Sequence, residues 1–217
     1  MPRKSEFDGA RLNRILQEQH LVISRAQAFA CGMSRGALQF RVGQSGPWQR
    51  LLPGVYLGVT GTVTQDQREV AALLYAGQGS MITGVTAVRR HHLRSPGPDS
   101  VDVLIPWNCK RQSIAFVRIH RTRRMPERLF VTGKIRFTMV PRAVADAARS
   151  MARFDDVRAV VCEAVQRTRP ASSAKSGWRS RRDSSVRRCP SSRCRQRHRR
   201  LLMMRSVPGD NPAKGQA

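Results

Sequence analysis

The 217-residue chain has few acidic side chains, few aromatic side chains and no long apolar run. Asp and Glu number 14 against 40 Lys and Arg, which gives a formal charge of +26. Because such an excess repels itself, an anionic partner is expected, nucleic acid first and an anionic membrane surface second. No run approaches the roughly 18 apolar residues that cross a bilayer, and the opening MPRKSEFDGA has no signal-peptide core. These absences predict a cytoplasmic protein with no membrane partner.

Cysteine is also sparse, and its spacing predicts no metal site. The five cysteines are an odd number without a disulfide framework, which is typical of reduced thiols. Cys189, Cys194 and His198 give C-x4-C-x3-H, which lacks both the paired C-x2-C spacing and a fourth ligand for zinc. Adjacent His91 and His92 on a helix would point about 100 degrees apart and could not easily share one ion.

Motifs that mark common enzyme classes are missing. There is no G-x-S-x-G nucleophile elbow and no phosphate-binding G-x4-G-K-S/T loop. A nuclease of the restriction-endonuclease fold needs Asp/Glu-x-Lys, yet none of the five lysines has an acidic residue two positions earlier. We therefore expect no enzyme activity, no catalytic residue and no cofactor. His120 is interpreted as part of a basic strand edge, either solvated or in contact with phosphate, and Asp146 as a structural hydrogen-bond acceptor.

The composition changes abruptly at Arg167. Residues 1–167 carry 26 Lys and Arg against 12 Asp and Glu, whereas residues 168–217 carry 14 against 2 and have few aliphatic residues. Such a segment buries too little apolar area to offset its ordering entropy, so a disordered basic tail is predicted. Two interpretations stay open: a tail that binds nucleic acid, and the product of a frame change in a GC-rich gene, which we favour.

The ordered part shows helical and strand periodicity in a mixed order. Helices are expected over 7–20, 24–31, 35–42, 64–75, 83–93, 141–151 and 154–166, and a short extended link over 21–23. The segment GPWQRLLPGVYLGV predicts two strands joined by a Pro-Gly turn, and further strands are expected over 101–105, 114–120, 129–132 and 135–138.

The segment SRAQAFACGMSRGALQFRV predicts two short helices joined by one turn. Ser24 is placed to cap the first helix, with Gln27 completing a capping box, and Ser34 to cap the second. Ala28, Gly32 and Leu38 have the spacing of a helix-turn-helix, in which a small residue, a turn glycine and a core aliphatic residue fix the interhelical angle. Two helices joined by glycine also occur in many all-helical proteins, and the hairpin that follows is what favours DNA binding.

If Leu38 and Val42 face inward, Arg35, Gly36, Gln39 and Gly43 face outward, where Arg35 and Gln39 can reach base edges in a major groove. Phe40 would either pack under the hairpin or lie exposed. The residues expected to contact DNA are Arg25, Ser34, Arg35, Gln39, Arg41, Gln49 and Arg50, the last two from the hairpin, or wing.

The run LVISRAQAFACGMSRGALQFRVGQSGPWQRLLPGVYLGVTG resembles the N-terminal winged-helix domain of AbiEi-type antitoxins of type IV toxin-antitoxin (abortive infection) systems. The matching pattern is Ser-Arg-x-Gln-Ala from Ser24, Gly-x-Ser-Arg-x-x-Leu from Gly32, and Gly-x-Trp-x-Arg-Leu-x-Pro-Gly-Val-Tyr from Gly46. The similarity continues more weakly to about Arg167, so it covers about three quarters of the chain. It implies a transcriptional regulator that represses its own operon and counters a nucleotidyltransferase toxin.

Together these observations predict an α+β fold with a winged helix-turn-helix over 1–62, a small mixed α/β domain over 63–167 and the basic tail over 168–217. The expected partner is double-stranded promoter DNA, and the resemblance adds the toxin. The alternative is a degenerate or truncated restriction-endonuclease-like protein that binds nucleic acid without specificity.

Overall fold

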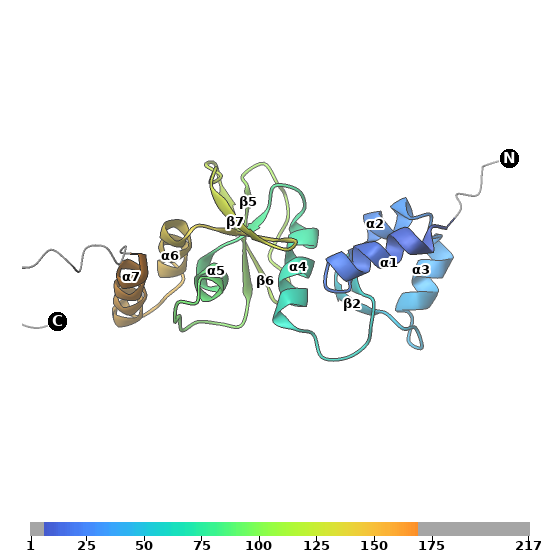
Figure 1. Cartoon of the computed structure of the whole chain (residues 1–217), viewed down its shortest axis with the longest axis horizontal. Coiled ribbons are helices and arrows are strands. Elements are labelled where there is room, and N and C mark those ends of the chain that lie inside the picture. Colours follow the sequence, from blue (N-terminus) through green and yellow to red (C-terminus); the bar gives the residue numbers. More distant parts are fainter. Residues whose placement is uncertain (1–6, 169–217) are drawn as a thin grey trace, which may run out of the picture. The chain divides into compact units, whose positions relative to one another are not determined.

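A computed structural model describes residues 7–168 of the chain, and these residues form a mixed α+β fold (Figure 1). Within this range seven helices accompany two β-sheets, which confirms the predicted α+β class. The predicted basic tail lies outside the described residues, apart from Thr168, and so do Cys189, Cys194 and His198.

Three helices and a three-stranded sheet make up the first part of the chain. The strands are antiparallel and have the order β1-β3-β2. The segment predicted as a link over 21–23 is thus a strand that pairs along β3. The first helix is shorter than predicted, because the Asp8 side chain accepts from the Arg11 amide and begins it at Gly9. The elements are α1 (Gly9–Glu18), β1 (Val22–Ser24), α2 (Arg25–Ala30), α3 (Arg35–Val42), β2 (Gln49–Leu52) and β3 (Val55–Leu57).

The second part contains a five-stranded mixed sheet of order β6-β5-β4-β8-β7. Strand pairs β5/β6 and β4/β8 are parallel, and pairs β4/β5 and β7/β8 are antiparallel. The elements are α4 (Gln65–Ala76), β4 (Met81–Ile82), α5 (Gly84–Arg90), β5 (Val101–Pro106), β6 (Val117–Thr122), β7 (Leu129–Thr132), β8 (Ile135–Thr138), α6 (Val140–Ala148) and α7 (Phe154–Thr168).

Several predicted boundaries shift. Strand β6 begins at Val117 and not at Ile114, which forms only an isolated bridge with Val117. Helix α6 ends at Ala148, three residues before the predicted end. The central strand β4 was not predicted, because a two-residue strand has no periodicity of its own and depends on its neighbours for pairing.

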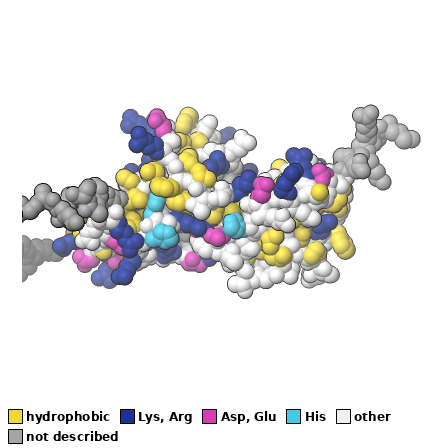
Figure 2. All heavy atoms as spheres, viewed as in Figure 1, with side chains coloured by type: hydrophobic (Ala, Val, Ile, Leu, Met, Phe, Trp, Pro, Cys, Tyr) yellow, Lys and Arg dark blue, Asp and Glu magenta, His cyan; other side chains and the backbone are white. Residues whose placement is uncertain are grey.

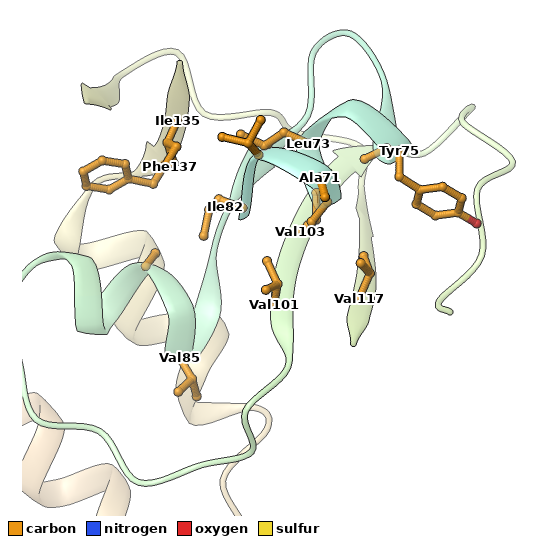
Figure 3. Close-up of a cluster of buried hydrophobic side chains, with 14 of the residues drawn as sticks. Ala71, Leu73, Tyr75, Ile82, Val85, Val101, Val103, Val117, Ile135 and Phe137 are labelled. Carbon is orange, nitrogen blue, oxygen red and sulfur yellow. The ribbon is translucent and has the colours of Figure 1, made fainter. Parts of the chain in front are cut away.

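Two clusters of buried side chains stabilise the fold. The larger, the central cluster, gathers residues of α4, β4, β5, β6 and β8, and Figure 3 shows Val101, Val103 and Val117 within it. The smaller, the N-terminal cluster, lies among α1, α2, α3 and the hairpin. Alternate residues of the three-stranded sheet belong to different clusters. Val22 and Leu57 pack into the central cluster, whereas Ile23 and Tyr56 pack into the N-terminal cluster. The N-terminal cluster comprises Leu12, Leu16, Ile23, Ala28, Cys31, Met33, Leu38, Trp48 and Tyr56.

Candidate nucleic-acid interface

The two helices of SRAQAFACGMSRGALQFRV begin and end where their capping residues predict. The Ser24 hydroxyl accepts from the Gln27 amide at 3.2 Å, and the Gln27 side chain accepts from the Ser24 amide at 2.9 Å, which completes the predicted capping box. Gly32 has φ of +79°, the left-handed conformation that glycine adopts after a helix end. The Ser34 hydroxyl accepts from the Ala37 amide at 3.1 Å and begins α3.

The angle between α2 and α3 is fixed by side chains of the N-terminal cluster. Ala28 is fully buried and Leu38 is nearly so, as predicted. Trp48 packs into the same cluster, and its backbone N–H donates to the Arg41 carbonyl at 2.8 Å. A Cβ at Gly46 would clash with the carbonyl oxygens of Phe40 and Arg41, so the turn between α3 and β2 requires glycine. The hairpin is therefore tied to the end of α3.

The outer face of α3 is open to solvent. Arg35, Gly36, Gln39 and Gly43 are exposed, as predicted. Phe40 is 78% exposed, which settles the question left by the sequence: its ring does not pack under the hairpin.

A groove of about 390 Å³ brings four of the seven predicted residues together. Arg25 enters it from α2, Arg35 and Gln39 from α3, and Arg50 from β2. The floor includes Phe29 and Tyr56, which sequence reasoning missed because aromatic residues at helical or strand spacing look like ordinary core. The Arg25 guanidinium lies 5.2 Å from the Phe29 ring centroid, a cation–π distance. Helices α2 and α3 and the hairpin thus form one concave basic surface.

The other three predicted residues do not line the groove, and two of them make contacts within their own segment. Ser34 is exposed, and its hydroxyl caps α3. Gln49 is half-buried in β2, opposite Leu57. The Arg41 guanidinium lies 5.3 Å from the Trp48 ring centroid and 5.7 Å from that of Phe7. Arg41 therefore packs against aromatic rings on the side of α3 near its C-terminal end.

The charge around the groove has one sign. Residues 19–65 contain four arginines and no Asp or Glu. Within the part of the chain that the structure describes, none of Arg25, Arg35, Arg41 and Arg50 has a carboxylate within 4 Å. On the face drawn in Figure 2, Lys and Arg side chains are more widespread than Asp and Glu. Such a surface attracts phosphate groups.

Two neighbouring carboxylates of α4, Asp66 and the buried Glu69, form ion pairs with one arginine of α5. The Arg90 guanidinium donates to Glu69 at 2.8 Å and also contacts Asp66, while the Gln65 side chain donates to Glu69 at 2.9 Å. Burial raises the pKa of Glu69 above its ordinary value of 4.5, although the hydrogen bond from Gln65 and the Arg90 charge oppose the shift. An acidic residue inside the apolar stretch REVAALLY is the one sequence signal of this site, and nothing in the sequence points to its partner Arg90, 21 positions later.

The polar residues singled out in the sequence also have structural partners. Asp146 is buried and accepts from Thr83 Oγ1 at 2.6 Å and from Arg142 Nε at 2.8 Å, which confirms its role as an acceptor. His120 lies on the edge strand β6, with its Nε2 2.9 Å from the buried Asp102 carboxylate. His91 Nε2 lies 2.8 Å from the Thr138 carbonyl oxygen. Among residues 7–168, no three His, Cys, Asp or Glu side chains are grouped to bind a metal ion.

No protein-family model matches the chain, and no curated protein matches it. None of the helices among the described residues is long and apolar enough to cross a bilayer.

Proposed function

We propose that the chain is a transcriptional regulator whose first part, α1 to β3, is a winged helix-turn-helix that binds promoter DNA. The observation that carries this proposal is the groove in which Arg25, Arg35, Gln39 and Arg50 meet. Helix α3 is the recognition helix, because its outer face is exposed and its first turn presents Arg35. The β2–β3 hairpin is the wing, and Arg50 contacts phosphate beside the groove that α3 enters.

The resemblance to AbiEi-type antitoxins extends this proposal. The regulator represses its own operon from the cytoplasm, and residues 63–167 counter a nucleotidyltransferase toxin. The test is binding of the full chain to the DNA upstream of its gene and to random duplex DNA over a salt series. Specific repression requires a preference for the upstream DNA that persists as salt rises, because the sequence-independent phosphate contacts weaken with salt. Equal affinity for the two duplexes at every salt concentration would refute it.

Replacing Arg35 by alanine should weaken binding to the preferred duplex by about 1–3 kcal/mol and reduce the preference at one base pair. The reason is that the exposed Arg35 guanidinium can donate two hydrogen bonds to a guanine edge. Fluorescence anisotropy with the preferred and random duplexes measures both effects. The matched control is Arg14→Ala on α1, which removes an exposed charge outside the groove and should change neither affinity by more than about 0.5 kcal/mol. An equal loss on both duplexes would assign Arg35 to phosphate.

Replacing Arg50 by alanine should weaken binding to preferred and random duplexes by the same factor. A contact to phosphate carries no base information, and its loss should reduce the slope of log K against log salt by about 0.9. The measurement is the same salt series, with Arg14→Ala on α1, an exposed charge outside the groove, as the control. A loss confined to the preferred duplex would show that Arg50 contacts a base edge.

A further inference from the structure

A second basic region lies in the other part of the chain, at the ends of β5 and β6. Residues 106–126 contain six Lys and Arg and no Asp or Glu. All six cationic residues are exposed, and within residues 7–168 none of their side chains has a carboxylate within 4 Å. We define the Trp107 surface as Trp107, Lys110, Arg111, Arg121, Arg123 and Arg124, which leaves out only Arg118 near the start of β6.

The loop that carries this surface is fixed at several points. The Arg121 side chain donates to the carbonyl oxygens of Cys109 at 3.1 Å and Arg111 at 2.7 Å. The Tyr75 hydroxyl, which points away from the central cluster in Figure 3, donates to the Gln112 carbonyl at 3.1 Å. The Arg111 guanidinium lies 5.3 Å from the Tyr75 ring centroid. These contacts order the loop before any ligand arrives, which lowers the entropy cost of binding.

An aromatic side chain is exposed in the middle of these cations. Trp107 is 63% exposed, while its backbone N–H donates to the Thr122 carbonyl at 2.9 Å and so fixes its position at the end of β5. The Arg123 guanidinium lies 5.9 Å from its ring centroid. A large apolar ring that remains in water beside unpaired cations is suited to a partner with both a flat apolar face and negative charge.

We propose that the Trp107 surface binds single-stranded nucleic acid, with one unpaired base stacked on Trp107 and the flanking phosphates paired with Arg123 and Arg124. Single strands present base faces next to phosphates, and aromatic side chains in a basic surface bind them in this way. A duplex buries its base faces in the stack and would use only the cations. An acidic protein would also use the cations but would not require base stacking. The three residues that make the proposed contacts, Trp107, Arg123 and Arg124, do not line the groove on α2, α3 and β2, so they add a second activity to the proposed DNA-binding one.

The test uses the full chain with fluorescein-labelled oligo(dT), oligo(U) and a random duplex, each of about 16 nucleotides or base pairs. Trp107→Ala should weaken both single strands by about fivefold or more and should leave the duplex within about twofold, because only the single strands lose a stacked base. Trp107→Phe should restore part of the affinity. Comparison of oligo(dT) with oligo(U) shows whether the strand is DNA or RNA.

A second variant tests the phosphate contacts separately. Arg123→Ser with Arg124→Ser should reduce the slope of log K against log salt on single strands by about 1.4, which is about 0.7 for each lost contact. Arg158→Ser removes an exposed charge on α7 that has no carboxylate within 4 Å among the described residues; it is the control and should leave the slope unchanged. All variants keep residues 168–217, so any binding by that basic segment is common to every measurement.

Two results would overturn the proposal. Equal weakening of single strands and duplex by Trp107→Ala would show that no base stacks there. Unchanged affinity in all the variants would leave the Trp107 surface to another class of partner, such as an acidic protein. Neither result bears on binding at the α3 groove, since affinity for the preferred duplex is measured independently.

Discussion

Replacing Trp48 by alanine is expected to lower the free energy of unfolding by about 3–5 kcal/mol, the largest effect of any substitution proposed for this chain. Trp48 is 5% exposed and lies in the N-terminal cluster with Leu38 and Tyr56. Its removal leaves a cavity between α3 and the hairpin, which the short elements around it cannot fill. Denaturant unfolding followed by circular dichroism measures the loss.

The matched control for Trp48→Ala is Trp107→Ala, because the two indoles differ chiefly in burial. Trp107 is 63% exposed, so its removal should change the free energy of unfolding by less than about 1 kcal/mol. Affinity for the preferred duplex should fall with Trp48→Ala and persist with Trp107→Ala. Similar stability losses for the two variants would contradict the placement of Trp48 in the N-terminal cluster.

Replacing Arg90 by methionine is expected to destabilise the fold by about 3 kcal/mol at neutral pH. The substitution removes the guanidinium that donates to Glu69 and leaves that carboxylate, which is 1% exposed, with the Gln65 side chain. A buried charge without a partner destabilises the folded state more than the intact ion pair does. Denaturant unfolding of the two proteins gives the difference directly.

The pH dependence of Arg90→Met provides an independent check. Burial already raises the pKa of Glu69, and loss of the Arg90 charge removes one of the interactions that lower it. Because the pKa of this carboxyl is higher in the folded state than in the unfolded state, protonation favours folding. The contribution is complete below the unfolded-state pKa and is lost as pH rises through the folded-state pKa. The destabilisation should therefore shrink as pH falls toward 4.5.

Arg89→Met is the control for Arg90→Met because Arg89 is the adjacent residue on α5 and is exposed. Its guanidinium donates to the carbonyl oxygens of Ser95 and Gly97, so a loss of about 1 kcal/mol is expected, with little dependence on pH. Equal losses in the free energy of unfolding for Arg89→Met and Arg90→Met at neutral pH would show that the buried Glu69 charge is not the cause of the destabilisation.

Local chemistry made much of the fold predictable. The capping box of Ser24 and Gln27, the cap at Ser34 and the left-handed Gly32 each involve residues within a few positions of one another, so the sequence alone predicts them. Strands β1 and β4 were harder, because they have three and two residues and are defined by their partners in the sheet. The order β6-β5-β4-β8-β7 depends on contacts between distant segments, which residue periodicity does not report.

The same distinction applies to the candidate site. The outward positions of Arg35 and Gln39 follow from helical periodicity once Leu38 is assigned to the core. Arg41 was expected to contact DNA as well, but its position relative to Trp48 depends on how the hairpin folds back after Gly46. The contribution of Tyr56 to the groove, and the pairing of Glu69 with Arg90, require elements to meet in space and had no local signal.

The three-stranded sheet also has a thermodynamic consequence. Because Ile23 and Tyr56 join one cluster while Val22 and Leu57 join the other, strands β1 and β3 each contribute to both halves of one compact unit. Unfolding of the second half would uncover one face of the sheet that contains the β2–β3 hairpin. Cooperativity between the halves then links the population of the conformation that we propose to bind DNA to events at the mixed sheet, without a hinge or a dedicated signal path.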